Sequence, residues 1–198
     1  MLSDLNYIGD GMMALFPESA EHAVDAAIAI VQEMGVYNKH RNHSGYGSID
    51  IGIGIHIGNL MLGTIGEANR MDGTVIADAV NLTARLEQLN KVFGSSVIIS
   101  RDVWETLPES KREHVRFLGR MTVRGRQEPV DVFEVFAGES PEQQELKKQT
   151  QAKFEAAVHA YNSNEMEKVR KLIQDVLSLN SEDQAATEYQ ERCSQQAK

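Results

Sequence analysis

Residues 48–58 carry the strictest pattern in the chain, an alternation of isoleucine with small or polar residues. Isoleucine occupies every second position from Ile49 to Ile57, and Gly52, Gly54 and Gly58 lie on the alternate positions. A period of two residues places the five isoleucines on one face of a β-strand, against a core. Glycine weakens a strand and often marks a close approach of another backbone. The sequence therefore predicts a buried strand whose nearly bare face lies against something close.

The segment before this strand predicts a hairpin and a helix. Residues 5–16 place Gly9-Asp10-Gly11 between two apolar runs, which is a typical hairpin signal. From residue 17 onward, apolar residues recur at helical spacing up to Met34, so one face of a helix is expected to be core. Residues 38–47 are polar and contain glycine, and they predict a loop.

The segment after the isoleucine strand alternates strands with helices. Residues 60–65 suggest a partner strand, and residues 74–93 an amphipathic helix with Leu82 and Leu86 facing inward. A short strand at 96–100 and a short helix at 101–107 follow. Residues 117–118, 121–123 and 130–136 read as further strands, with a turn at Arg124-Gly125-Arg126. The expected class is α+β, a mostly antiparallel sheet with helices on one side.

From about residue 139 the chain becomes rich in Gln, Glu and Lys, and its pattern is purely helical. One helix around Phe154, a second from Met166, and the start of a third near Ala185 resemble a tetratricopeptide-like helical pair. A single repeat cannot bury its apolar face alone. We therefore expect two domains, at 1–138 and 139–198, with the tail packed on the first domain, on a second chain, or on further repeats.

Composition limits the classes of partner. The chain of 198 residues is 41% hydrophobic with a formal net charge of -9, so without a basic stripe it repels nucleic acid and anionic membranes. No stretch approaches the roughly 20 apolar residues that span a bilayer. The single cysteine, Cys193, cannot form an intrachain disulfide. We expect a cytoplasmic protein, or the cytosolic part of a larger, membrane-bound one.

Three polar residues draw attention before any family is considered. Asp10 lies in the hairpin turn and could hold a divalent cation, although Asp-Gly turns are common without any ligand. Asn81 and Arg85 lie four residues apart, and so share a helix face opposite the buried leucines. An amide beside a guanidinium suits a sugar oxygen and a phosphate with growing charge. The alternative is an ordinary solvated face, with Arg85 paired to Asp78.

Three segments together resemble the signatures of class III adenylyl and guanylyl cyclases. They are NYIGDGMMA at 6–14, IGIHIG at 53–58 and MDGTVIADAVNLTARLE at 71–87, and their order and spacing also match. The third is very specific, the second moderately so, and the Gly-Asp pair of the first is weak on its own. The resemblance covers about residues 5–136 and implies a ferredoxin-like cyclase fold followed by a C-terminal helical hairpin.

The resemblance also implies a division of roles at a homodimer interface. Asp10 of one subunit would help to hold two divalent cations, Mg²⁺ or Mn²⁺. From the other subunit, Asn81 would orient the ribose and Arg85 would stabilise the transition state. The turn at 124–126 matches the place of a triphosphate-binding lysine, for which we prefer Arg126 over Arg124, although a solvated basic turn is the alternative.

Two positions bear on the choice of base in this family. Thr74 is typical of adenylyl cyclases, whereas Asn6 stands where they usually have lysine and guanylyl types have glutamate. An amide can still donate to or accept from a purine. The sequence thus favours ATP over GTP and predicts synthesis of 3',5'-cyclic AMP and pyrophosphate in signal transduction. The alternative function is a catalytically inactive pseudo-cyclase that binds nucleotide or dimerises, and the tail could bind a protein partner.

The chain also departs from the family pattern at its start. The family's domain begins with a strand that bears the other metal-binding aspartate, followed by two helices, and the four residues before Leu5 cannot supply them. Either a longer protein contains this chain or it is a degenerate homologue. The missing strand would be central, so we expect an unpaired edge and exposed apolar surface. By itself the chain should be poorly stable, inactive, or rescued by association.

Overall fold

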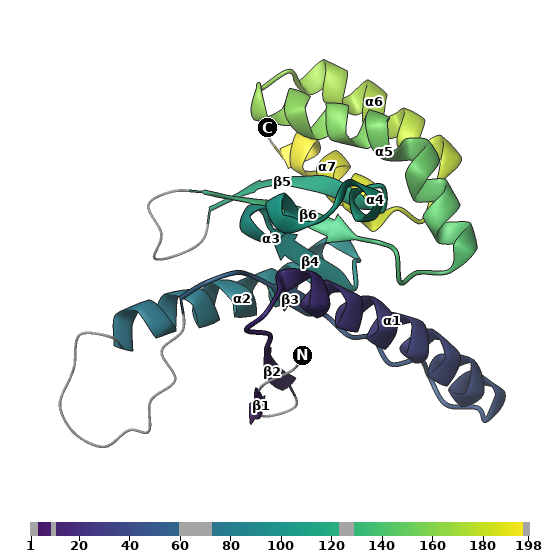
Figure 1. Ribbon diagram of the computed structural model, residues 1–198. Coiled ribbons are helices and arrows are strands. Elements are labelled where there is room, and N and C mark those ends of the chain that lie inside the picture. The colour runs from purple at the N-terminus through teal and green to yellow at the C-terminus, as the bar shows by residue number, and fades with distance from the viewer. Residues whose placement is uncertain (1–3, 9–10, 60–72, 123–128, 196–198) are drawn as a thin grey trace.

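The computed structural model describes residues 4–8, 11–59, 73–122 and 129–195, except the side chains of 4–8 and 73–77 (Figure 1). It consists of a four-stranded sheet, a separate hairpin and helices, which confirms the α+β class. The elements are β1 (Asp4–Ile8), β2 (Gly11–Leu15), α1 (Ala20–His43), β3 (Ile53–Ile55), α2 (Gly73–Phe93), β4 (Val97–Ser100), α3 (Arg101–Thr106), α4 (Glu109–Arg112), β5 (Val115–Met121), β6 (Val130–Val135), α5 (Pro141–Asn162), α6 (Met166–Leu179) and α7 (Gln184–Gln195).

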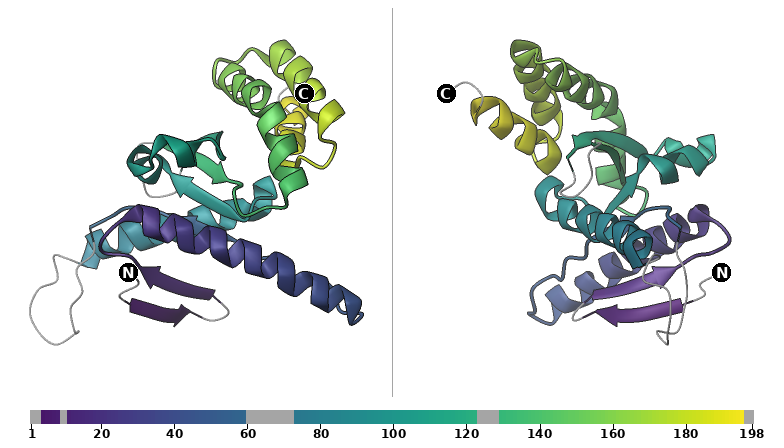
Figure 2. Two further views of the ribbon diagram at one scale, coloured as in Figure 1. Left: turned by 45° about the vertical axis from the view of Figure 1, so that its right-hand side comes forward. Right: turned by 90° about the vertical axis from the view of Figure 1, so that its left-hand side faces the viewer.

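Within the described residues, the strands form two separate sheets. The larger sheet has the order β3-β4-β6-β5, with β3 parallel to β4 and the other neighbours antiparallel. The predicted hairpin is confirmed, since β1 pairs antiparallel with β2 in a sheet of its own. Figures 1 and 2 show this hairpin below α1 and α2 and away from the C-terminal helices. Within the described residues, β3 is therefore an edge strand with one neighbour.

Strand β3 is much shorter than the sequence predicts. Its ladder is limited to Ile53–Ile55, which pair with three of the four residues of β4. Further upstream, the side-chain amide of Asn38 exchanges two hydrogen bonds of 2.9 Å with the backbone of Ile49, so α1 takes the place of a strand partner. Ile49 and Ile57 are each 41% exposed. The prediction of a core face along all five isoleucines is therefore wrong at both ends. The suggested partner strand at 60–65 lies outside the described residues.

The close approach predicted for the glycine face is confirmed, and the approaching element is α2. A Cβ added at Gly54 would lie 2.5 Å from the amide nitrogen of Glu87 and closer still to the carbonyl oxygen of Thr83. At Gly58 it would meet the side chain of Ala79. Glycine thus lets the backbone of α2 lie directly on this segment, as strand glycines often do.

We expect Gly54→Ala to lower the free energy of unfolding by about 1–3 kcal/mol, because the new methyl group meets helix backbone that cannot move alone. The measurement is urea denaturation of the chain. Gly35→Ala is the matched control: Gly35 lies inside α1 with open space around it, so alanine should stabilise by about 0.5–1 kcal/mol. Equal stabilities of the two variants would contradict this account of the glycine face.

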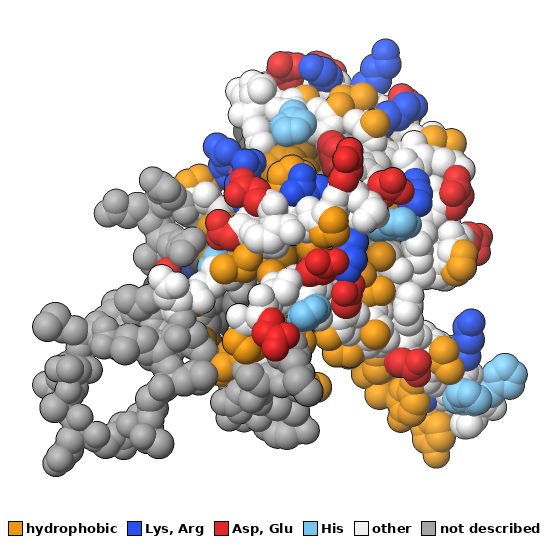
Figure 3. Space-filling model, viewed as in Figure 1, with side chains coloured by type: hydrophobic (Ala, Val, Ile, Leu, Met, Phe, Trp, Pro, Cys, Tyr) orange, Lys and Arg blue, Asp and Glu red, His pale blue; other side chains and the backbone are white. Residues whose placement is uncertain are grey.

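Helix α1 differs from its prediction in length and in burial. It continues to His43, through residues expected to form a loop, and the side chains of Arg41 and Asn42 bond the returning chain at Gly47 and Ser48. Its predicted core face is buried in the N-terminal half alone, since Ile30 is 44% exposed. The C-terminal half of α1 extends away from the sheet, and apolar side chains gather along this half in the surface view (Figure 3). The large exposed ones there are Ile30, Val36, Tyr37, Tyr46 and Ile49.

Helices cover both faces of the larger sheet, so the expectation of helices on one side is wrong. Strand β4 explains this, because all four of its residues are buried and its side chains alternate between two cores. Ile99 joins a core with Val24 of α1 and Val103 of α3. Ile98 joins the other core with Leu86 of α2 and Phe154 of α5.

Strand β5 is a single strand where the sequence suggested two. A bulge between Phe117 and Gly119 interrupts its register, and Gly119 has a φ of 129°, which favours glycine. Side chains of α5 close its outer edge: Glu155 accepts a 2.9 Å hydrogen bond from the amide of Phe117, and Gln151 donates one of 2.9 Å to the carbonyl of Val115. These two bonds occupy part of the edge that a neighbouring strand would use.

The C-terminal helices confirm the helical prediction for the tail and add a complete third helix. Ser140 caps α5 by accepting from the amide of Gln143, and Pro141 suits the first turn because it needs no donor there. Asn164, at φ 61°, makes the turn into α6. We call α5, α6 and α7 the helical tail. Its likeness to tetratricopeptide repeats and the boundary at 138/139 stay predictions.

A buried ionic network ties the helical tail to the sheet. Arg116 of β5 donates to Glu134 of β6 at 2.5 Å and, through two nitrogens, to Asp183 before α7 at 2.6 and 3.0 Å. Lys147 of α5 donates to Glu134 at 2.7 Å and also to Glu139. Arg116, Glu134 and Asp183 are at most 2% exposed. Buried charges are tolerated when they are paired and hydrogen-bonded in this way.

Opposing effects act on the pKa values in this network. Burial alone would raise the pKa of Glu134, but the charges of Arg116 and Lys147 hold it below its ordinary value. Asp183 follows the same rule: burial raises its pKa, but Arg116, the amide of Ala186 and the charge of Lys147 together hold it below its ordinary value. Burial dominates at Glu139, whose pKa is raised. The carboxylates of Glu134 and Asp183 are therefore charged in the folded protein at neutral pH.

Candidate active site

Helix α2 carries the two polar residues that the sequence places on one face. Leu82 and Leu86 are at most 1% exposed, as their spacing predicts. Asn81 is exposed and Arg85 is half-buried, so their face lies away from the core as expected. Asp78 is exposed on the same helix, and both it and Arg85 have interactions with other groups. The alternative of a pair between Arg85 and Asp78 therefore stays open.

The other predicted site residues fall where side chains are not described. Asn6 lies in β1, where its backbone is paired with Met13, and Thr74 is the second residue of α2. Asp10, Arg124 and Arg126 lie outside the described residues. The structure thus brings Asn81 and Arg85 together on one helix, and the remaining site residues stay predictions. Among the described residues, no group of three or more His, Cys, Asp or Glu side chains is arranged to hold a metal ion.

The side chain of His56, the residue that follows β3, is almost fully buried in the structure. Its side chain is 3% exposed, and its Nδ1 lies 2.9 Å from Oγ of Ser100 and 3.5 Å from a carboxylate oxygen of Asp102. The ring thus bridges the end of β3 to the start of α3. Both partners contact the same nitrogen, so the three residues are not arranged as a catalytic relay, which uses the two ring nitrogens separately.

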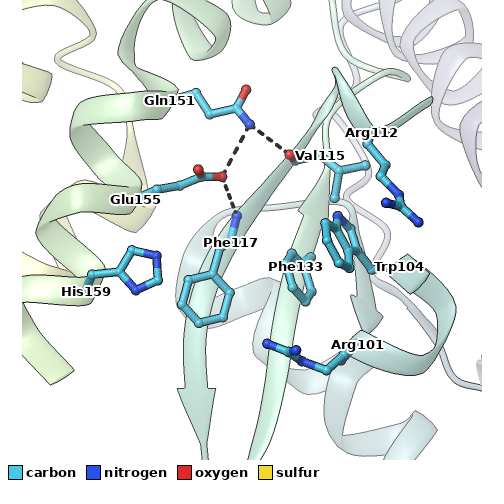
Figure 4. A pocket seen from close by; sticks show the side chains of 9 residues that line it. All are labelled: Arg101, Trp104, Arg112, Val115, Phe117, Phe133, Gln151, Glu155 and His159. Atoms are coloured by element: carbon cyan, nitrogen blue, oxygen red, sulfur yellow. Dashed lines mark hydrogen bonds between the residues drawn. The ribbon is translucent and has the colours of Figure 1, made fainter. Parts of the chain in front are cut away.

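A pocket of about 330 Å³ opens at the outer edge of β5, between the sheet and α5 (Figure 4). Its floor is a row of rings in which Trp104 stacks on Phe133 at 5.1 Å between centroids, and Phe117 stacks on His159 at 5.3 Å. Phe133 belongs to the core on the α1 side of the sheet, whereas α2 packs on the opposite side. This pocket is therefore separate from the face of Asn81 and Arg85.

The cations that line this pocket are already engaged by the protein. Arg101 binds the buried carboxylate of Asp131 at 2.5 Å. Arg112 lies over the ring of Trp104 at 4.4 Å and donates to the carbonyl oxygen of Glu105 at 2.9 Å. Arg101 and Arg112 are thus paired with groups of the protein itself, and none of the residues that line the pocket belongs to the predicted nucleotide site.

The sequence analysis missed the ionic network of Arg116, Glu134 and Asp183. A signal for it exists: Arg116 and Glu134 each interrupt an apolar strand, at Val-Arg-Phe-Leu and Val-Phe-Glu-Val. A charged residue inside a buried strand needs a buried partner. The pairing with Asp183 bridges 67 residues of sequence and leaves no local pattern.

Comparisons with known proteins identify a family whose matched segment includes β1 to β6 and the α2 helix. The model of the family described as "Adenylate and Guanylate cyclase catalytic domain" matches residues 3–136. The chain is 36% identical over 137 residues to "Adenylate cyclase" of Anabaena cylindrica, covering 66% of this chain and 27% of that protein. It is 32% identical over 200 residues to "Adenylate cyclase, terminal-differentiation specific" of Dictyostelium discoideum, covering 97% of this chain and 9% of that protein.

A third relative, "Adenylate cyclase 1" of Rhizobium meliloti, is 30% identical over 137 residues, or 66% of this chain and 20% of its own length. The chain thus spans between 9% and 27% of the lengths of these three relatives. A match over 97% of the chain must include most of residues 139–198, so the Dictyostelium protein is similar in the helical tail as well. No described helix combines the length and apolar character that crossing a membrane requires.

Proposed function

This chain belongs to the adenylate and guanylate cyclase catalytic-domain family, and from that membership we propose that it converts ATP to 3',5'-cyclic AMP and pyrophosphate. The observation that carries the proposal is the pair of Asn81 and Arg85 on the outer face of α2. The opposite face of the same helix is fixed in the core by Leu82 and Leu86. A rigid helix is a precise support for groups that must meet a reacting phosphate.

In this proposal each side chain has one task. The amide of Asn81 orients the ribose so that its 3'-oxygen lies in line with the α-phosphorus, and the guanidinium of Arg85 donates to the phosphoryl oxygens as negative charge grows on them. Arg126, or Arg124 in its place, neutralises the triphosphate. The 3'-oxygen forms a bond to the α-phosphorus as the bond to the leaving oxygen breaks, which releases pyrophosphate, and the 3'-hydroxyl proton passes to water.

Two divalent cations, Mg²⁺ or Mn²⁺, complete the proposed site. Asp10, in the two residues that separate β1 from β2, is the carboxylate that this chain offers to hold them, and carboxylate oxygen is the donor that such hard cations prefer. When bound, the cations would activate the attacking oxygen and stabilise charge on the phosphates. The side chains of this chain bind and orient the nucleotide around them.

We propose that the site forms between two copies of the chain. One subunit supplies Asp10, and the other supplies Asn81 and Arg85, so an isologous dimer has two equivalent sites. Asn81 is exposed in the single chain, which leaves it accessible to a partner. The reaction requires ATP, which fits the cytoplasmic location that we expect for this segment. The helical tail could bind a further protein.

Base selection yields a prediction about Asn6 and Thr74. We expect the double change Asn6→Glu and Thr74→Cys to raise the ratio of kcat/KM for GTP over that for ATP about tenfold or more, because a carboxylate can accept from the guanine ring nitrogen and exocyclic amine. Thr83→Cys is the matched control. It lies on the same helix, but its hydroxyl donates to the carbonyl oxygen of Ala79 at 2.9 Å. An unchanged ratio in the double variant would remove these residues from base selection.

The decisive test is the production of cyclic nucleotide from Mn²⁺-ATP by the full-length protein that contains this chain. Cyclic AMP formation that is lost on Arg85→Ala supports the proposal. Tight ATP binding without turnover, measured by calorimetry with ATP and a non-hydrolysable analogue, would instead indicate a nucleotide-binding pseudo-cyclase. Absence of both turnover and binding would overturn any nucleotide role for this domain.

A further inference from the structure

Helix α2 shares its core with the helical tail. Leu86 and Phe93 of α2 belong to the same buried cluster as Phe154 of α5, Ile173 of α6 and Tyr189 of α7. The face of α2 opposite Asn81 and Arg85 therefore rests partly on residues from outside the matched family domain, which ends at residue 136. Helix α5 lies along β5, whereas α7, yellow in Figure 2, contacts α2.

Helix α7 also contacts the C-terminal end of α2 directly. The side-chain amide of Gln184 donates a 3.1 Å hydrogen bond to the carbonyl oxygen of Lys91, one of the last carbonyls of α2. The guanidinium of Arg192 lies over the ring of Phe93, 5.3 Å from its centroid. At Gly94, which ends the helix at φ 61°, an added Cβ would lie 2.6 Å from the side chain of Gln184. The end of α2 is thus capped and covered by α7.

Helix α7 is itself fixed to the sheet at two points. Asp183, at its start, binds Arg116 through both carboxylate oxygens and accepts from the amide of Ala186. The hydroxyl of Tyr189 donates to the carbonyl oxygen of Leu118 at 2.7 Å. A helix anchored in this way can transmit rigidity to what it touches, because packed elements resist small displacements.

We propose that Gln184 and Arg192 are positioning residues, which hold α2 so that Arg85 and Asn81 meet the nucleotide correctly. This inference rests on the proposed cyclase function for its effect on the reaction. Its physical basis is that a displacement of about 1 Å at a reacting group can cost about 100-fold in rate. The helical tail is then part of the catalytic scaffold as well as a surface for partners.

The experiment is the double change Gln184→Ala and Arg192→Ala in the full-length protein. We expect kcat for cyclic AMP formation to fall about tenfold while KM for ATP changes less than about twofold, because the nucleotide contacts remain but are misaligned. Arg192→Lys with Gln184 intact should retain most activity, since it keeps a cation over the ring. The control is Gln190→Ala with Ser194→Ala, two exposed positions on the opposite side of α7.

A second readout is independent of activity. In the double variant, amide hydrogen exchange should be faster in residues 85–93 than in wild type, and the control variant should match wild type. Unchanged exchange overturns the proposal whether or not the protein is a cyclase. Faster exchange with unchanged kcat overturns the positioning role. If the wild type makes no cyclic nucleotide, the proposed function fails and the exchange result still decides whether α7 braces α2.

The variants should also be combined with Arg85→Ala. If α7 acts through Arg85, the double change at Gln184 and Arg192 should lower kcat by much less in this background than in wild type, since coupled sites are not additive. Full additivity would assign the loss to general destabilisation and contradict the proposal.

Discussion

Replacing Arg85 by alanine is expected to lower kcat for cyclic AMP formation by about 10²- to 10³-fold while KM for ATP changes little. Arg85 is proposed to act on charge that exists in the transition state, and removing such a donor costs about this much. The kcat of Arg85→Lys should lie between those of wild type and Arg85→Ala, because lysine keeps the charge but not the planar pair of donors. The measurement is steady-state kinetics with Mn²⁺-ATP.

Arg170→Ala is the matched control for this experiment. Arg170 lies on the surface of the helical tail and is paired with Glu167 one turn away. It should leave kcat within about twofold of wild type, because exposed pairs of this kind contribute little. An equal loss in the two variants would show that Arg85 has no special role.

Mixing two inactive variants tests whether the site is shared. Asp10→Ala and Arg85→Ala should each retain about 1% of wild-type activity or less, and an equal mixture should recover about a quarter of it. Half of the dimers in the mixture contain one chain of each kind, and each such dimer has one intact site of two. No recovery, although the two variants are shown to exchange subunits, would place Asp10 and Arg85 in the same protomer's site.

The largest expected effect on stability is that of Arg116→Ala. The change leaves the buried carboxylates of Glu134 and Asp183 with Lys147 as the nearest cation of the network, and it should lower the free energy of unfolding by about 3–5 kcal/mol. Urea denaturation measures this, with Arg170→Ala again as the control, for which we expect less than about 0.5 kcal/mol. A loss below about 1 kcal/mol for Arg116→Ala would show that the network stabilises little.

The same network predicts how stability depends on pH. Glu134 and Asp183 have folded pKa values below their ordinary values of 4.5 and 3.8. A lowered folded pKa stabilises the protein above the unfolded value, and this stability is lost as the pH falls through the folded value. The free energy of unfolding of wild type should therefore fall steeply below about pH 4. In Arg116→Ala this acid-dependent part of the loss should be smaller.

The sequence predicted the elements whose patterns are local. Helix α2 and the tail helices have long apolar repeats at helical spacing, and the hairpin has a Gly-Asp-Gly turn, so these were recognisable one at a time. The face of Asn81 and Arg85 followed from their spacing of four residues alone. The glycines at 52–58 even indicated that another backbone lies close, although they did not identify it as α2.

The predictions that failed concern elements whose structure depends on contacts with distant parts of the chain. The pattern at 48–58 suits a long strand, but β4 supplies three pairing positions to β3, and Asn38 bonds the backbone at Ile49 instead. Helix α1 continues through a polar segment, where the side chains of Asn38, Arg41 and Asn42 bond the returning chain at residues 47–49. The network around Arg116 could not be found from local sequence, since it joins two strands, a helix and a residue far along the chain. Tertiary contacts decided all three cases.

The closed edge of β5 has a consequence for how far this protein can be shortened. Gln151 and Glu155 of α5 occupy the backbone groups of Val115 and Phe117, so a chain cut after residue 138 would present these groups to water. Bare strand edges pair readily with other molecules and polymerise. The last 60 residues therefore shield part of this edge, and we expect truncation to the matched family segment to promote self-association, which light scattering of the truncated chain would measure.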